Sequence, residues 1–143
     1  MIEVPRDDIV LMLEAGYIYL AMTKLKEARA VFEGIIALKP DHEVPHVALA
    51  NVLFAEKKYL PAIRSLKDAL KINEKSAFAY AHLGEALLFY GKKDEALKAL
   101  DKACELDTAG TAGDFAKSLK NLVLEGYDPV KFRAEASQKA ALR

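Results

Sequence analysis

The sequence contains no Trp and only one Cys, and neither sign of charge is in excess: Lys and Arg total 21, as do Asp and Glu. A single cysteine excludes an intramolecular disulfide. Nucleic-acid binding needs a basic stripe that displaces counterions from phosphates, and no such stripe is visible among the interspersed charges. No run of 18 apolar residues occurs, so a membrane-spanning helix is not expected either.

The first eight residues, Met-Ile-Glu-Val-Pro-Arg-Asp-Asp, lack the basic and then apolar layout of a secretory signal. A cytoplasmic protein is therefore the expectation. The hydrophobic content of 52% is enough for the packed interior of a single domain over residues 1–143. A net charge of zero does little to keep copies apart, which leaves a homo- or hetero-dimer open.

The main signal is self-similarity at one fixed period along the chain. Six sets of three residues, which we call columns, have members that stand one period apart and agree in size. The columns are Gly16/Ala50/Gly84, Ala28/Ala62/Ala96, Phe32/Leu66/Leu100, Leu38/Ile72/Leu106, Tyr19/Leu53/Leu87 and Leu20/Phe54/Leu88. Such a period indicates stacked helix pairs. The small residues allow the two helices of a pair to approach closely, and the large residues of the third column fill the space between neighbouring pairs.

These columns resemble the tetratricopeptide repeat family, whose unit of about 34 residues matches the spacing of the columns. In that family small, Ala and large apolar residues stand at the eighth, twentieth and twenty-fourth positions of the unit. The resemblance covers repeats 9–42, 43–76 and 77–110. It implies an all-α solenoid of three helix-turn-helix repeats followed by C-terminal capping helices. The chain departs from the family pattern where Glu74 and Thr108 replace a frequent Pro, and where Met12, His46 and Tyr80 stand in place of the usual Trp.

Local signals predict where the helices begin and end. We expect Asp7 to cap a first helix that runs to about Met22, and Asp94 to cap the sixth helix. Pro45 and Pro61 fit the first turns of the third and fourth helices, where a missing N–H does no harm. Gly91 is expected to end the fifth helix.

After Leu106 the repeat register is lost, and residues 108–113 read as a short flexible link. Two further helices are predicted, over about 114–126, with Gly126 as its stop, and 129–142, with Asp128-Pro129 as a strong start. An open stack would leave its last apolar face in water, so the first of these helices is expected to cap it. Whether the second packs or stays free for a partner is left open.

One string, His42-Glu43-Val44-Pro45-His46, formally matches the H-E-x-x-H signature of zinc proteases. The match straddles two repeats, and Pro45 between the two histidines disfavours the continuous helix that the motif needs. We therefore expect no metal, no cofactor and no catalysis. Cys104 lies among apolar positions and is expected to be a small core residue.

In the resembling family, the first helix of each repeat lines a concave groove. The positions carried over that are expected to bind a partner are Leu13, Tyr17, Leu20, Val47, Asn51, Phe54, Phe78, His82, Glu85 and Phe89. Family members that grip the acidic tails of heat-shock chaperones use cations, whereas the matching positions here are Leu13, Tyr17, Ala48, Phe78 and His82. Binding to acidic tails is therefore not expected.

An apolar groove suits an amphipathic helix or an extended apolar segment of a partner protein. The leading hypothesis is a chaperone or adaptor that sequesters such a segment. In size, repeat number and groove character the chain resembles the small bacterial chaperones of type III secretion, which shield needle or translocator subunits. The chain's own last helix, or a second copy, could also fill the groove. The alternative is a scaffold subunit that binds through its convex face or its C-terminal helix.

Overall fold

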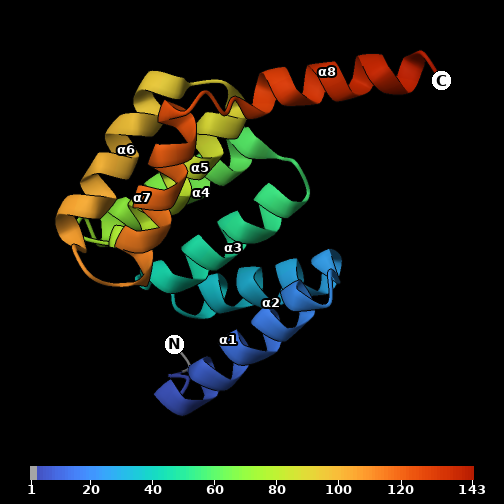
Figure 1. Ribbon diagram of the computed structural model, residues 1–143. Coiled ribbons are helices and arrows are strands. Elements are labelled where there is room, and N and C mark those ends of the chain that lie inside the picture. The colour runs from blue at the N-terminus through green and yellow to red at the C-terminus, as the bar shows by residue number, and fades with distance from the viewer. Residues whose placement is uncertain (1–2) are drawn as a thin grey trace. The chain divides into compact units, whose positions relative to one another are not determined.

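The computed structural model describes residues 3–143, and within that range the regular elements are helices and no strand is formed. In chain order they are α1 Arg6–Ala21, α2 Leu25–Leu38, α3 Glu43–Ala55, α4 Tyr59–Ile72, α5 Ala77–Tyr90, α6 Lys93–Leu106, α7 Thr111–Leu124 and α8 Pro129–Ala141 (Figure 1). Each predicted repeat therefore contains one helical hairpin. The all-α, helix-turn-helix fold expected from the repeat period is confirmed.

The contacts divide the chain into two compact units, Met1–Glu74 and Lys75–Arg143. Unit 1 contains α1 to α4, and unit 2 contains α5 to α8. Each unit is described by itself. A single domain over residues 1–143 stays a prediction.

The core of unit 1 forms where α1, α2 and α3 meet. Its buried side chains are Ile9, Ala28, Phe32, Ile35, Ala48 and Val52. Phe32 and Leu66 are 0% and 1% exposed, as the column of large residues predicted. Gly16 has no room for a side chain, because a Cβ there would lie 2.7 Å from Cζ of the Phe32 ring. The small column thus allows the close approach of α1 and α2.

The turn inside each repeat is built in the same way three times. Thr23, Lys57 and Gly91 stand one repeat period apart and have positive φ values of 56°, 63° and 101°. One residue later, Lys24, Lys58 and Lys92 donate their backbone N–H groups to the carbonyl oxygens of Tyr19, Leu53 and Leu87, at 2.9, 2.8 and 2.8 Å. This is the hydrogen bond of a Schellman ending, and Gly91 ends α5 as predicted.

Two predicted caps are wrong. Asp7 does not cap α1, which begins at Arg6 after Pro5, and Asp94 does not cap α6, which begins at Lys93. The Schellman turn aims the chain directly into the next helix, so the helix starts before Asp94 is reached. Both acids lie in the first turn, where a carboxylate interacts favourably with the positive end of the helix dipole.

The segment predicted as a flexible link is partly helical, because α7 begins at Thr111 and ends at Leu124, not at 114 and 126. The Asp107 carboxylate accepts hydrogen bonds from the N–H of Gly110 at 2.9 Å and of Gly113 at 3.0 Å, which fixes the start of the helix. A Cβ on Gly113 would collide with the Asp107 carbonyl oxygen. Gly110 and Gly113 are thus required by close packing rather than by flexibility.

The bounds of α7 nevertheless keep the repeat period, since Thr111 and Leu124 lie one repeat period after the first and last residues of α5, Ala77 and Tyr90. The helix continues the period although most of the sequence columns fail. It packs on α5 and α6, as a capping helix should. Lys120 of α7 approaches Asp101 of α6 to 2.5 Å, and this hydrogen bond raises the pKa of Lys120.

Two further expectations concern the last third of the chain. Cys104 is only half-buried rather than part of the core, and its Sγ lies 3.8 Å from the Gly113 carbonyl oxygen at the contact between α6 and α7. The predicted start of α8 is confirmed, because the Asp128 side chain accepts hydrogen bonds from the N–H groups of Val130 and Lys131. Beyond its first turns α8 extends away from the other helices of unit 2 (Figure 1).

Candidate functional site

The candidate binding residues of unit 1 lie on the first helix of each of its two repeats. We call them the unit 1 surface, and they are Leu13, Tyr17 and Leu20 of α1 with Val47, Asn51 and Phe54 of α3. Val47 is buried, at 8% exposed, so other residues of the chain already cover it. Tyr17 is 40% exposed and the remaining four residues are half-buried. Apart from Val47, the set offers a mostly apolar surface with one amide.

The two aromatic side chains of the unit 1 surface are fixed from behind by other rings. Tyr17 meets Phe32 edge-on, with ring centroids 5.3 Å apart and planes at 62°. Phe54 meets Tyr59 in the same way, at 5.4 Å and 63°. Partial burial raises the pKa of the Tyr17 hydroxyl above its ordinary value of 10.0, so this side chain is neutral at physiological pH. Rigid, neutral aromatics of this kind are suited to anchor a partner.

The candidate residues of unit 2, which we call the unit 2 surface, are Phe78, His82, Glu85 and Phe89 on α5. Phe78 is 52% exposed. His82 Nδ1 lies 3.6 Å from a Glu85 carboxylate oxygen, one helical turn away. The His82 ring also tilts against Phe115 of α7, with centroids 5.5 Å apart. The capping helix α7 therefore already covers part of this surface.

A residue that the sequence analysis missed, Arg133 of α8, covers another part of the unit 2 surface. Its Nη2 donates a hydrogen bond of 2.7 Å to the Phe89 carbonyl oxygen, and its guanidinium carbon lies 5.7 Å from the centre of the Phe89 ring. A cation is favourable here, because the carbonyl oxygens of the last turn of α5 carry partial negative charge. No sequence signal indicated this contact, because it joins residues that are 44 positions apart in the chain.

The H-E-x-x-H string is divided by the start of a helix. His42 is the N-cap residue of α3 and lies outside it, whereas His46 lies within the helix with its Nε2 3.5 Å from the Pro40 carbonyl oxygen. Pro45 is buried in the first turn between them, as predicted. Across residues 3–143, no three side chains of His, Cys, Asp or Glu gather as metal ligands would.

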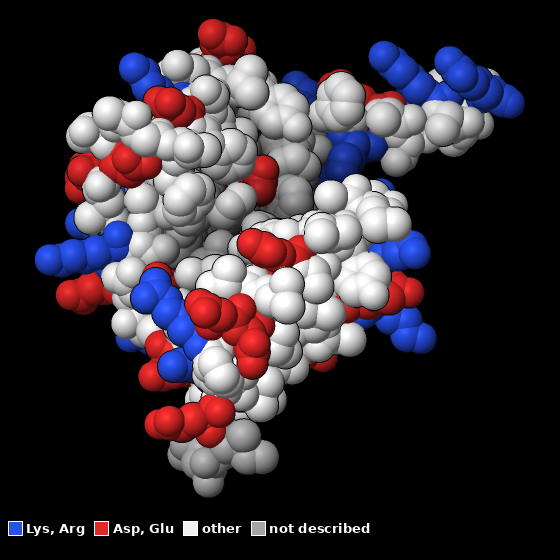
Figure 2. Space-filling model, turned by 90° about the horizontal axis from the view of Figure 1, so that it is seen from below, with Lys and Arg blue, Asp and Glu red and all other residues white. Residues whose placement is uncertain are grey.

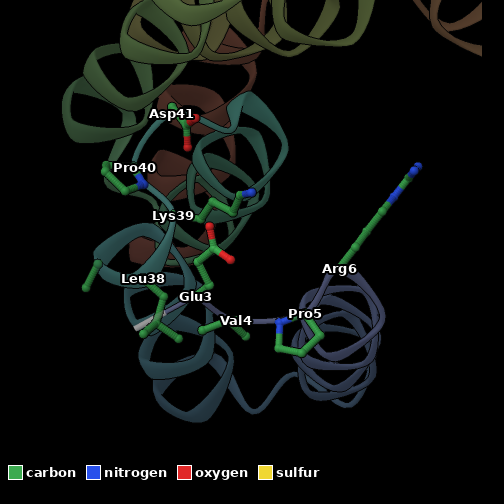
Figure 3. Close-up of a pocket in the computed structure, with 9 residues that line it drawn as sticks. Glu3, Val4, Pro5, Arg6, Leu38, Lys39, Pro40 and Asp41 are labelled. Carbon is green, nitrogen blue, oxygen red and sulfur yellow. The ribbon is translucent and has the colours of Figure 1, made fainter. Parts of the chain in front are cut away.

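A cleft of about 830 Å³ lies in unit 1 (Figure 3). The segment that precedes α1 forms one wall, and the end of α2 with the following turn forms the other; the lining residues are Glu3, Val4, Pro5, Arg6, Ala37, Leu38, Lys39, Pro40 and Asp41. The Arg6 side chain points away from it. No residue predicted from the sequence to bind a partner lines this cleft.

Charge is mixed on the side of the molecule that is seen from below (Figure 2). Lys and Arg side chains alternate with Asp and Glu on the face shown in Figure 2, without a continuous basic stripe. Among the described residues no helix is long and apolar enough to cross a lipid bilayer. The unit 1 surface has no Lys or Arg, and Arg133 is the cation that the structure adds at the unit 2 surface.

Solved structures with the same fold include several domains that contain a bound peptide. The first tetratricopeptide domain of Spaghetti (RPAP3), bound to the HSP90 peptide SRMEEVD, is 22% identical, with a TM-score of 0.76 over 87% of this chain and 97% of that one. The Yersinia enterocolitica type III secretion chaperone SycD, with a peptide of the translocator YopD, is 20% identical, with a TM-score of 0.71 over 83% and 97%. At such identities the similarity establishes the fold.

A third structure, PcrH with the chaperone binding region of PopB, is 16% identical, with a TM-score of 0.74 over 85% of this chain and 98% of that one. No curated protein matches the sequence. Residues 21–103, more than half of the chain, match the family model described as anaphase-promoting complex, cyclosome, subunit 3. Together with the repeated hairpins and the solved relatives, this match establishes that the chain belongs to that family of tetratricopeptide repeat proteins.

Proposed function

We propose that this protein is an interaction module that acts by binding and not by catalysis, and that it sequesters an apolar or amphipathic segment of a partner protein. The observation that carries the proposal is the unit 1 surface. Tyr17 and Phe54 are partly exposed there, each is fixed from behind by another ring, and the surface has no charged side chain. Such a surface gains free energy by burying apolar area, on the order of 25 cal/mol per Å² before ordering costs.

The chemistry of the surfaces favours an apolar partner over an acidic tail. RPAP3 binds an HSP90 peptide whose sequence ends in Glu-Glu-Val-Asp. A carboxylate-rich peptide needs cations, and the positions carried over from the family for that role are Leu13, Tyr17, Ala48, Phe78 and His82. SycD binds a peptide of the translocator YopD, and PcrH binds the chaperone binding region of PopB. A type III secretion chaperone in the bacterial cytoplasm is therefore the more specific form of the proposal.

The test places an acid on each of the two candidate surfaces. Phe54→Glu combined with Phe89→Glu should abolish capture of the partner from a lysate of the native host, read by mass spectrometry, while helicity by circular dichroism stays the same. Leu124→Glu is the matched control: Leu124 is apolar, 67% exposed and lies on α7, outside both surfaces. Full capture by the double variant would exclude binding through these residues.

A titration with the peptide SRMEEVD separates the two partner classes. We expect no binding in the micromolar range, because an apolar surface leaves the carboxylates of the peptide without counter-charges. Micromolar affinity would show that the partner is an acidic tail, and Arg133→Ala would then reveal whether the cation next to Phe89 is responsible.

One observation favours the alternative, a scaffold that binds through its last helix. On α8, Val130 and Phe132 are 41% and 63% exposed. Truncation after Gly126 distinguishes the two functions, because a partner of the scaffold is lost with α8. A partner of the unit 1 surface is retained, because that surface consists of residues of α1 and α3.

A further inference from the structure

The last helix of unit 2, α8, is attached to the other helices only near its start. Among the described residues, α5 is the one helix on which α8 packs. Pro129 is buried and Arg133 is half-buried, whereas every residue of 134–143 is exposed. Figure 1 shows the same arrangement, with α8 leaving α5 after its first turns. The contact between the two helices therefore ends within the second turn of α8.

Two side chains on one face of α8 make this contact. Arg133 donates its hydrogen bond to the Phe89 carbonyl oxygen and lies over the Phe89 ring. Val130 stands three residues earlier, on the same side of the helix. It packs on the turn that ends α5, where its Cγ2 would lie 3.7 Å from a Cβ on Gly91. The pair thus uses an aromatic ring and a helix end that carries partial negative charge.

The connection between α7 and α8 does not fix the direction of α8. Two residues after α7 ends at Leu124, Gly126 has a φ of 103°, and no atom lies within 4 Å of an added Cβ there. Asp128 caps α8, so the helix does not need α5 in order to begin. In the part of the chain that the structure describes, α7 and α8 do not pack on each other. The contact of Val130 and Arg133 with α5 therefore decides where α8 lies.

This contact occupies a place that the proposed function assigns to a partner. Phe89 belongs to the unit 2 surface, and a partner that packs on its ring has to displace Arg133. Because a short segment links α8 to α7, α5 meets α8 at an effective concentration on the order of millimolar. The apparent affinity of a partner for Phe89 is lowered by the fraction of molecules in which α8 is in place.

The chemistry of the contact indicates which partner can displace α8. The Phe89 carbonyl oxygen lies in the last turn of α5, where carbonyl groups have no donor within the helix. A wholly apolar segment would remove the hydrogen bond from Arg133 and supply none in return. An acidic side chain would be repelled by the negative end of the helix dipole. A segment that carries a cation replaces both interactions of Arg133.

We infer that Val130 and Arg133 form a latch, the α8 latch, which closes the unit 2 surface, and that the partner that opens it is a helix that brings an Arg or Lys of its own to the last turn of α5. The inference rests on the proposed function, because it takes the unit 2 surface as a partner site. It adds a cation to the apolar or amphipathic segment proposed above, and it makes binding at Phe89 conditional on the release of α8.

A peptide titration of the full chain, followed by amide NMR, tests the α8 latch. The probe is a synthetic peptide of residues 127–143, which contains its own copies of Val130 and Arg133. In the Arg133→Ala chain the latch is open. The peptide should therefore shift the amide signals of Phe89 and Gly91, and bind at least about tenfold more tightly than to the wild type. Lys139→Ala is the matched control, because it removes the same charge from an exposed position of α8 and should bind as weakly as the wild type.

Variants of the peptide test the chemistry of the partner. The peptide with Arg133→Ala should not bind the open chain, whereas the peptide with Arg133→Lys should. Equal affinity of the original peptide for the wild-type and Arg133→Ala chains would overturn the latch, as would the absence of shifts at millimolar peptide. Equal binding of the Arg133→Ala peptide would overturn the requirement for a cation.

A variant of the unit 1 surface separates this inference from the proposed function. Phe54→Glu should leave every result of the peptide titration unchanged, because Phe54 lies on α3 and not on α5. Changed peptide binding in that variant would count against a site at Phe89. The latch can thus fail while partner binding at the unit 1 surface holds, and the reverse.

Discussion

Gly16 of α1 lies so close to the ring of Phe32 of α2 that a Cβ on Gly16 would stand 2.7 Å from Cζ of that ring. The third repeat repeats this relationship, since a Cβ on Gly84 would lie 2.6 Å from Cγ of Leu100. In the second repeat the corresponding residues are Ala50 and the smaller Leu66, and both are 1% exposed. Each hairpin thus balances a small residue against the large residue that fills its interior.

We predict that Gly16→Ala destabilises the protein. Overpacking against Phe32 costs about 1–3 kcal/mol, of which the better helix propensity of Ala returns about 1 kcal/mol. Urea unfolding measures the change. Adding Phe32→Leu should recover part of the loss, because it reproduces the Ala50 and Leu66 pair of the second repeat.

The matched control for that substitution is Gly34→Ala in α2, where no atom lies within 4 Å of an added Cβ. Here only the helix propensity acts, and we expect a gain of about 0.5–1 kcal/mol. Equal effects of the two substitutions would contradict the packing argument.

The three repeat turns predict a stabilising substitution. Lys57 has a φ of 63°, a left-handed conformation that costs a residue with a side chain about 1–2 kcal/mol, whereas Gly91 adopts it freely in the third repeat. Lys57→Gly should raise the free energy of unfolding by about 0.5–1 kcal/mol, after the extra entropy of glycine in the unfolded chain is subtracted. Thermal unfolding is the measurement.

The neighbouring Lys58→Gly serves as the comparison for that turn, because Lys58 has a φ of −94° and nothing to gain from glycine. It should be neutral or destabilising. Gly91→Ala should cost about 1 kcal/mol or more, since it forces a side chain into the left-handed conformation. A stabilising Lys58→Gly would refute the assignment of the strain to residue 57.

We predict that Asp107→Ala costs about 1–2 kcal/mol, because it removes the acceptor of the Gly110 and Gly113 N–H groups at the start of α7. Hydrogen exchange should show the loss in the first turn of α7. Asp94→Ala, which removes the cap expected from the sequence alone, should cost less than about 1 kcal/mol, since Asp94 acts only on the helix dipole. If Asp94→Ala cost more stability than Asp107→Ala, Asp94 would be the helix cap that the sequence predicted.

Alkaline pH should destabilise the wild type more than Tyr17→Phe. Burial raises the pKa of Tyr17 in the folded protein, so the unfolded chain loses this proton first, near its ordinary value of 10.0. The contribution of Tyr17 is therefore fully present below pH 10.0 and is lost as the pH rises from there through the folded pKa. Urea unfolding of both proteins from neutral to alkaline pH measures it. A difference in stability that is independent of pH would count against the burial of this hydroxyl.

Arg133→Ala should loosen α8 without affecting the other helices of unit 2. The substitution removes the hydrogen bond to the Phe89 carbonyl oxygen and the cation over the Phe89 ring. Hydrogen exchange in α8 should become faster, while α5 to α7 keep their protection. Arg143→Ala, near the exposed end of the helix, is the control and should change nothing. Unchanged protection of α8 in Arg133→Ala would show that other contacts attach it.

Much of the fold can be read from local chemistry. The repeat columns identify the hairpins, because a small residue opposite Phe32 or Leu100 is a requirement of helix packing that the side chains themselves carry. Proline in a first turn and Gly91 at a helix end are equally local, since each depends only on backbone conformation. The start of α8 at Asp128-Pro129 belongs to the same class.

Other features depended on residues that only the tertiary structure brings together. Asp107 moves the start of α7 to Thr111 because its carboxylate reaches two glycine N–H groups of a segment that reads as flexible. The candidate site also depends partly on local sequence and partly on tertiary structure. The sequence identified the aromatic residues Tyr17, Phe54 and Phe89, but the burial of Val47 and the contact of Arg133 with Phe89 follow from packing between helices distant in the chain. Periodicity identified the helices of this protein, whereas burial decided which of their faces remain available to a partner.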